Sequence, residues 1–256
     1  RRKIMNRIKS EKVKLKTRRT FLKKGTCSRT FFYILNQEFG FPKDYEEQAS
    51  DLLAGGIMQQ GYQCGMLWGT SFAIGAEAQR KYGNSGKAIS VSVEATRQII
   101  KNFSDKINSI ECCDITNCKF THKSGLLKFF VTGKPVKCMN LAAKWAPSAI
   151  DVANDSLSID ESELYDKSMS CATEVARKMG ASDEEMIMVS GFAGGMGLSG
   201  NGCGALSAAI WMESLKLTRE MNGKSVYPNS KAQKTLDTFL ESVGYEVKDV
   251  GMVSED

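Results

Sequence analysis

The stretch AGGIMQQGYQCG (residues 54–65) has a close counterpart in AGGMGLSGNGCG (residues 193–204), and this repetition decides the fold. Both copies open with Ala-Gly-Gly and close with Cys-Gly, and both place a glycine (Gly61 or Gly200) three residues before the cysteine. The offset is 139 residues at each of these positions. Because self-similarity at a fixed offset indicates an internal duplication, we expect two related structural units.

The sequence on either side of each copy predicts helices. Upstream, residues 25–40 and 168–180 each place a cysteine (Cys27 or Cys171) beside Ser or Thr, and each stretch ends at a glycine suited to a helix C-terminus. Downstream, residues 64–82 and 203–217 carry small side chains at helical spacing, namely Gly65, Gly69, Ala73 and Ala76 in the first copy and Gly204, Ala205, Ala208 and Ala209 in the second. We expect these two small faces to meet at a pseudo-two-fold contact between the units.

The composition indicates an all-α protein with a hydrophobic core. Hydrophobic residues make up 42% of the 256 positions, only four prolines are present, and runs of alternating β-branched residues are nearly absent. No apolar run approaches the roughly 20 residues that span a bilayer, so no membrane span is expected. The predicted organisation is a basic N-terminal arm (1–24), a first helical unit (25–156) and a second, cysteine-poorer unit (165–246).

The positive charge is concentrated in the N-terminal arm. Residues 1–24 carry twelve Lys or Arg and one Glu, a net +11, so the total of +6 leaves −5 for the rest of the chain. No basic surface interleaved with aromatic residues follows, so nucleic-acid binding is not favoured. We expect a solvated helix that packs Ile4, Ile8 and Leu15 against the body.

The end of this arm, RRTFLKKG (residues 18–25), imitates a twin-arginine export signal but lacks the apolar region and the cleavage site of such a signal. A cytoplasmic location is expected, with export left open.

The cysteine pattern excludes several kinds of site. Eight cysteines accompany a single histidine, His122, in a polar THK segment that we expect at the surface. The chain has no Cys-x-x-Cys and no Cys-x-x-Cys-His, so thioredoxin-type and covalent haem motifs are absent, and one histidine cannot form a Cys2His2 zinc site. Gly195, Gly197 and Gly200 spell GxGxxG, but Met58 replaces the middle glycine in the first copy, so a dinucleotide fingerprint is not favoured.

The glycine loops place a cysteine sulfur at the start of a helix in both units. Helix N-terminal amides favour a thiolate, so we expect lowered pKa values at Cys64 and Cys203. Only the first copy is followed by further cysteines: Cys112, Cys113 and Cys118 lie close together, and Cys138 is expected at the start of another helix. The first copy can therefore gather four or more thiolates, whereas the second offers Cys171 and Cys203.

These residues resemble the C_GCAxxG_C_C family of redox-active proteins. The resemblance rests on Cys27, on Cys64-Gly65, on Cys112 and Cys138, and on GFAGGMGLSGNGCGALSAAI (residues 191–210). It covers residues 18–156 and part of 168–245. The resemblance implies an all-helical fold and redox work by cysteines, with an iron–sulfur cluster (2Fe-2S or 4Fe-4S) as the implied cofactor.

Three functions stay open at this point. The first is an iron–sulfur protein that transfers electrons to a redox partner protein, with ligands drawn from Cys27, Cys64, Cys112 or Cys118, and Cys138. The second is a metal-free thiol–disulfide protein that pairs Cys27 with Cys64 and Cys171 with Cys203. The third is a helical interaction protein with a structural zinc site or inert buried cysteines, of which Cys113 is the best example. The sequence assigns no enzyme activity, and a homo-oligomer is possible.

Overall fold

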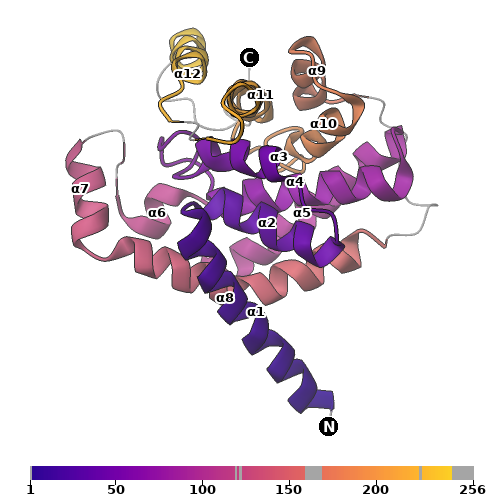
Figure 1. The fold of residues 1–256 in the computed structure, drawn as a ribbon, viewed down its shortest axis with the longest axis vertical. Coiled ribbons are helices and arrows are strands. Elements are labelled where there is room, and N and C mark those ends of the chain that lie inside the picture. Colours follow the sequence, from indigo (N-terminus) through magenta and orange to yellow (C-terminus); the bar gives the residue numbers. More distant parts are fainter. Residues whose placement is uncertain (1, 119, 121–122, 159–168, 225–226, 244–256) are drawn as a thin grey trace.

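The computed structural model describes residues 2–118, 120, 123–158, 169–224 and 227–243, with side chains from residue 7 on except at position 123. Within these ranges the regular elements are helices, and β-structure is limited to isolated bridge residues, which include the pair Gln63 and Glu111. The all-α prediction is therefore confirmed. Figure 1 shows the helices in chain order.

The first copy and the residues after it contribute most of the helices. They are α2 (Cys27–Phe39), α3 (Asp44–Ala49), η1 (Ser50–Leu53), α4 (Gly65–Tyr82), α5 (Gly86–Ile107), α6 (Cys112–Thr116), α7 (Lys123–Val131) and α8 (Lys134–Ser156). The second copy repeats the order of α2 to α5, and nothing in it corresponds to α6–α8 within the described residues. Its helices are α9 (Cys171–Lys178), α10 (Asp183–Met188), η3 (Ser190–Phe192), α11 (Gly204–Glu220) and α12 (Ser230–Val243).

The helix ends follow the capping residues of the sequence. The side chain of Thr26 accepts a hydrogen bond from the N–H of Arg29 at the start of α2, and Ser170 forms a capping box at the start of α9. Gly40 ends α2 in the left-handed conformation, with φ of 85°. These caps satisfy backbone groups that a helix end leaves without an intrahelical partner.

Each glycine-rich loop contains one left-handed turn. All five residues in 55–59 and all five in 194–198 have positive φ, between 46° and 75°. The N–H groups of residues 57–62 bond to carbonyls within 52–57, and residues 196–201 repeat every one of these six bonds at the offset of 139. Left-handed backbone costs about 1–2 kcal/mol per non-glycine residue, so the shared hydrogen bonds are what hold the turn in place.

Two equivalent glycines explain why the motif is retained in both loops. A Cβ atom at Gly56 would lie 2.3 Å from the backbone N of Tyr62, and one at Gly195 would lie 2.3 Å from the backbone N of Asn201. Short helices α3–η1 and α10–η3 precede the loops, and no βαβ unit occurs among the described residues, so neither loop is a dinucleotide fingerprint. Met58, like its counterpart Gly197, has a positive φ (46° and 57°).

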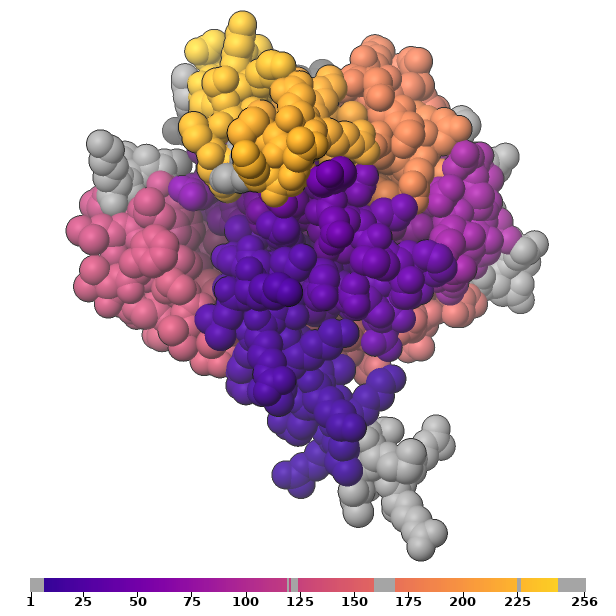
Figure 2. All heavy atoms as spheres, in the orientation of Figure 1, coloured from indigo at the N-terminus to yellow at the C-terminus, as the bar shows by residue number. Residues whose placement is uncertain are grey.

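The two copies pack against each other through reciprocal contacts. Helix α4 contacts α10 of the second copy, and the equivalent α11 contacts α3 of the first. The indole N–H of Trp211 donates to the backbone oxygen of Glu46 (3.2 Å), and Arg219 bridges Glu46 and its counterpart Glu185. This exchange of contacts is what a two-fold arrangement requires. The space-filling view shows the second copy, orange to yellow, covering one side of the first (Figure 2).

The small faces of α4 and α11 do not meet, so that expectation is wrong. A Cβ at Gly69 would lie 2.0 Å from the backbone oxygen of Ser28, which places this face of α4 against α2 of the same copy. A Cβ at Gly75 would lie 2.5 Å from the backbone oxygen of Ile187 in α10. The spacing of small residues correctly indicates a close approach of helices, but it carries no information about which helix approaches.

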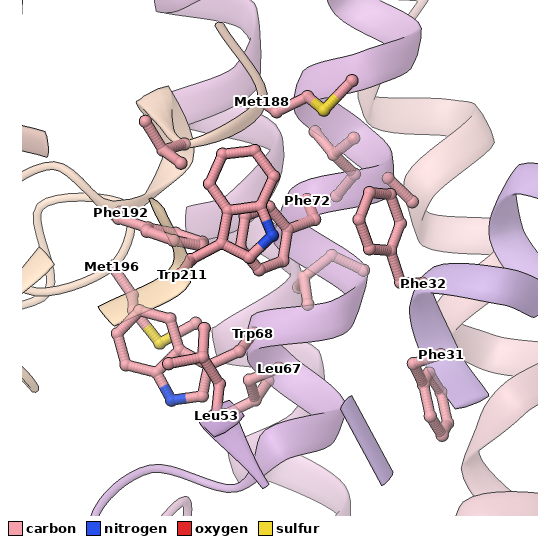
Figure 3. Close-up of a cluster of buried hydrophobic side chains, with 14 of the residues drawn as sticks. Phe31, Phe32, Leu53, Leu67, Trp68, Phe72, Met188, Phe192, Met196 and Trp211 are labelled. Carbon is pink, nitrogen blue, oxygen red and sulfur yellow. The ribbon is translucent and has the colours of Figure 1, made fainter. Parts of the chain in front are cut away.

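Large aromatic side chains fill the junction between the copies. Phe72 of α4 lies with its ring centroid 4.7 Å from Phe192 and 4.8 Å from Trp211, and Trp68 meets Phe192 edge-on at 4.8 Å. Figure 3 shows these rings together, with Phe32 stacked on the far side of Phe72. All five side chains are buried, so they form one hydrophobic core across both copies.

The basic arm is the helix α1 (Arg2–Lys24), which packs on α8 and α2. The buried positions are Thr17 and Thr20, whereas Ile8 and Leu15 are 51% and 49% exposed, so the predicted packing face is wrong. The side chain of Ile4 lies outside the described residues. The hydroxyl of Thr17 donates to the backbone oxygen of Val13 (2.8 Å), which allows a polar side chain to occupy the buried face. None of the described helices is both long and apolar enough to cross a membrane.

Candidate functional site

Cys27 and Cys64 lie side by side where α2 and α4 begin. Cys27 is the first residue of α2, and Cys64 is the N-cap of α4. Their side chains share a hydrogen bond. A Cβ at Gly65 would lie 2.6 Å from the sulfur of Cys27, so the Cys-Gly pair is needed for the two helix ends to come this close.

The two thiols of this pair differ in acidity. The hydrogen bond from Cys64 lowers the pKa of Cys27 despite burial, and backbone N–H groups at Gly55 and Ser28 contribute in the same direction. The bond to Cys27 and burial raise the pKa of Cys64 well above its ordinary value. The prediction of helix-start acidity is therefore wrong for Cys64, because it ignored the hydrogen bond to Cys27 and the cost of burying a charge. Cys27 is the residue that the local amides favour as a thiolate.

The end of the first glycine loop positions Cys112. Residues 61–64 run beside residues 110–113: the N–H of Cys64 donates to the oxygen of Ile110, and the N–H of Cys112 donates to the oxygen of Tyr62, both at 2.7 Å. The side chain of Gln63 adds a bond to the carboxylate of Glu111 (2.6 Å). This short antiparallel pairing brings together two cysteines that are 48 residues apart in the sequence.

Cys112 and Cys118 are buried beside each other in a small cluster with Phe120. Burial raises the pKa of Cys112, and the nearby Cys27 and Cys138 raise it further. Cys113 differs: its sulfur lies 3.6 Å from a carboxylate oxygen of Asp114, and the residue is only half-buried. Of the three cysteines in 112–118, Cys112 and Cys118 are the buried ones. Cys113, whose charge also raises the pKa of Cys112, contacts Asp114.

Cys138 approaches the same cluster from α8. This helix begins at Lys134, with Pro135 in its first turn, so Cys138 lies one turn inside the helix and its predicted place at the helix start is wrong. Burial raises the pKa of Cys138 to about 12, and the charges of Cys27 and Cys118 act in the same direction. Cys64, Cys112 and Cys138 thus lie within electrostatic range of Cys27, and Cys118 lies within range of Cys138. These five thiols form the first thiol cluster.

The second copy assembles a smaller thiol pair. Cys203 is the N-cap of α11, and Cys171 begins α9, where it is exposed. Burial raises the pKa of Cys203, although the N–H groups of Ala205 and Leu206 act against it, and the charge of Cys171 raises it slightly. The lowered pKa expected for Cys203 is therefore also wrong. No other cysteine contributes to the pKa of Cys203, so this copy holds two thiols where the first holds five.

The first cluster has the donor chemistry of an iron–sulfur site. Its candidate donor groups are thiols, which suit soft metal ions and iron–sulfur clusters. The buried hydroxyl of Ser28, next to Cys27, has no hydrogen-bond partner among the described residues and remains available as a donor. In the described part of the chain no three Cys, His, Asp or Glu side chains are already arranged tightly enough to hold an ion, so binding requires the thiols to close in. His122 lies outside the described residues.

Sequence reasoning missed the polar residues around Cys27. The hydroxyl of Thr26 donates to the carboxylate of Asp51 (2.5 Å), and Tyr227 donates to the backbone oxygen of Asp51 (3.2 Å). Burial raises the pKa of Asp51 to about 6, although Thr26 and Arg29 oppose the shift. Tyr227 comes from the second copy, and burial raises its pKa, with smaller effects of the charges of Asp51 and Cys27 in the same direction. Since the hydrogen bond from Tyr227 to Asp51 joins residues 176 positions apart, no local sequence pattern predicts it.

Comparison with protein families gives two matches within this chain. The family described as "Putative redox-active protein (C_GCAxxG_C_C)" matches residues 26–150 and again residues 165–248. The first match contains the five-thiol cluster, and the second contains Cys171 and Cys203. No curated protein and no solved structure matches the chain.

Proposed function

Because the chain belongs to the C_GCAxxG_C_C family of redox-active proteins, we propose that its first copy is a redox centre that holds an iron–sulfur cluster. The proposed ligands are Cys27, Cys64, Cys112 and Cys138, with Cys118 as the remaining candidate. The observation that carries the proposal is the central place of Cys27. Its side chain shares a hydrogen bond with that of Cys64, and it raises the pKa of both Cys112 and Cys138, which come from distant parts of the sequence.

The surrounding residues suit a buried centre of negative charge. A cluster bound here supplies one-electron transfer, and hydrogen bonds to its sulfurs and its exposure to solvent tune the potential. N–H groups at Gly55 and Ser28 point to the sulfur of Cys27, and burial of Cys64 and Cys112 keeps water away from two further ligands. Electrons would be exchanged with a redox partner protein.

The composition of the purified protein tests the proposal. Protein prepared without oxygen should contain iron and acid-labile sulfide in matching amounts, with visible absorbance that Cys64→Ser abolishes. The matched control is Cys203→Ser, which alters the equivalent N-cap cysteine of the second copy and should leave iron and absorbance unchanged. Zinc without iron would instead indicate a structural site. Unchanged absorbance in Cys64→Ser would remove Cys64 from the ligand set.

The hydrogen bond between Cys27 and Cys64 also favours a second function, that of a thiol–disulfide protein. In that reaction the Cys27 thiolate attacks one sulfur of a partner disulfide, and Cys64 then displaces the partner. Two protein thiols are thereby oxidised to a disulfide while the partner gains two electrons and two protons. Mass spectrometry of the non-reduced protein tests this alternative for Cys27–Cys64 and for Cys171–Cys203. A complete set of free thiols together with stoichiometric iron would count against it.

A further inference from the structure

A surface pocket of about 480 Å³ opens directly beside Cys138. It lies between the C-terminal end of α5, helix α6 and the first turns of α8. Cys138 is part of its wall, so the pocket connects the thiol cluster with solvent. Its volume falls within the range of small-molecule sites and far exceeds what an inorganic ion or a few waters need.

The pocket combines an apolar wall with two cationic groups. Ile107, Ile115 and Leu141 supply the apolar surface, and Lys134 and Lys137 supply two ammonium groups from one face of α8. Asp114 also lines the pocket, but its carboxylate already accepts hydrogen bonds from the hydroxyl of Ser109 (3.0 Å) and the thiol of Cys113 (3.6 Å). The lining therefore has a net charge of +1, and its carboxylate is engaged within the protein.

We propose that this pocket binds a small organic anion, a carboxylate with a short apolar body, and brings it against Cys138. The two lysines would hold the carboxylate, and the isoleucines and leucine would cover the apolar part. The proposal that the anion binds depends only on the residues that line the pocket. The role of the bound anion as the small-molecule substrate or regulator of the redox centre rests on the function proposed above.

The difference between a carboxylate and its neutral amide tests the binding. The full chain, purified without oxygen, is titrated calorimetrically with benzoate and with benzamide, which have the same shape and differ in charge. Benzoate should bind about tenfold more tightly, since two partly exposed ammonium groups attract its carboxylate and gain little from a neutral amide. Lys134→Gln combined with Lys137→Gln should lower the benzoate affinity about tenfold and leave that of benzamide unchanged.

The chain offers a matched control for this double variant. Lys231 and Lys234 have the same spacing on the exposed surface of α12, and replacing both by Gln should leave benzoate binding unchanged. Equal affinities for benzoate and benzamide, no binding of benzoate, or unchanged benzoate affinity in Lys134→Gln/Lys137→Gln would each overturn the proposal. Iron and sulfide are measured on the same samples, so a protein that binds benzoate without iron refutes only the cluster, and one with iron that does not bind benzoate refutes only the pocket.

Access to Cys138 has its own measurement. In reduced, metal-free protein the sulfur of Cys138 displaces iodide from iodoacetate or iodoacetamide, a carbon–sulfur bond forms, and the thiol proton passes to solvent. Exposed Cys171, outside the pocket, is the internal reference. The ratio of iodoacetate to iodoacetamide rates should be higher at Cys138 than at Cys171, and Lys134→Gln/Lys137→Gln should remove the difference. Equal ratios at the two cysteines in the unaltered protein would contradict anion binding beside Cys138.

Discussion

Phe72 and Trp211 occupy equivalent positions in the two copies, 139 residues apart, and their rings contact each other with centroids 4.8 Å apart. A residue that touches its own counterpart marks the axis of a two-fold arrangement. The helices that carry this pair also exchange contacts, α4 with α10 and α11 with α3. The two copies therefore share one core, and its centre is aromatic.

Phe72→Ala should destabilise the whole chain by about 3–5 kcal/mol, because Phe72 is fully buried and contacts Phe32, Phe192 and Trp211. Urea unfolding followed by circular dichroism and by tryptophan fluorescence should show one transition shifted equally in both signals. Phe130→Ala is the control, since Phe130 is 62% exposed on α7, and it should change stability by less than about 0.5 kcal/mol. Two separate transitions in the unaltered protein would contradict a shared core.

Gly69→Ala should destabilise the protein by about 2–3 kcal/mol, although alanine is the better helix former. The added Cβ would lie 2.0 Å from the oxygen of Ser28 and 2.9 Å from the nitrogen of Phe32, both backbone atoms of α2. The control is Gly40→Asn, which has open space around it and a φ that asparagine tolerates. The melting temperature reports both, and a Gly69→Ala protein as stable as the Gly40→Asn protein would refute the close packing of α2 on α4.

Asp51 should make the protein less stable as the pH rises. Its pKa increases from 3.8 to about 6 on folding, chiefly through burial, so the native state binds the proton more tightly than the unfolded chain. This contribution to stability is fully present below pH 4 and is lost as the pH rises through 6; two pH units correspond to about 3 kcal/mol. The unfolding free energy of the unaltered protein relative to Asp51→Asn should therefore fall by about that amount between pH 4 and 7. If this difference in unfolding free energy were constant or rose with pH, the pKa of Asp51 would not be raised on folding.

Replacing Cys112 and replacing Cys113 should have different effects on the iron content of the protein. Cys112→Ser should lose most of the iron, because Cys112 is buried and lies within range of Cys27 and Cys138. Cys113→Ser should retain it, since Cys113 contacts Asp114 instead. Iron per chain and the visible spectrum report the outcome, and iron loss in both variants would place Cys113 in the ligand set.

The duplication made most of the fold predictable from sequence. Fixed offsets located each loop, and the cysteines flanked by Ser or Thr, Cys27 and Cys171, marked the helix starts correctly, because capping depends on neighbouring residues only. The left-handed sense of the loops was not predictable: Ile57 is β-branched and disfavours positive φ, and it is held there by hydrogen bonds that the sequence does not display.

The sequence predicted the candidate cysteines of the site, but it did not predict their pKa values or the polar residues around them. The cysteine spacing predicted the candidate thiols, and their role as ligands stays a prediction. The raised pKa of Cys64 depends on its hydrogen bond to Cys27 and on burial, and that of Cys203 depends on burial, and the helix-start argument omitted both effects. Asp51 and Tyr227 come together only through the packing of the second copy on the first. Contacts of that range follow from the tertiary structure alone.

The reciprocal packing of the copies has a consequence for synthesis on the ribosome. Chains are made at roughly 5–20 residues per second, and domains usually fold as they emerge. Here the ring of Phe72 lacks two of its aromatic contacts until Phe192 and Trp211 have been translated, more than a hundred residues later. The five-thiol half therefore spends many seconds of its synthesis with its central aromatic side chain uncovered, which is when the nascent chain most needs a chaperone.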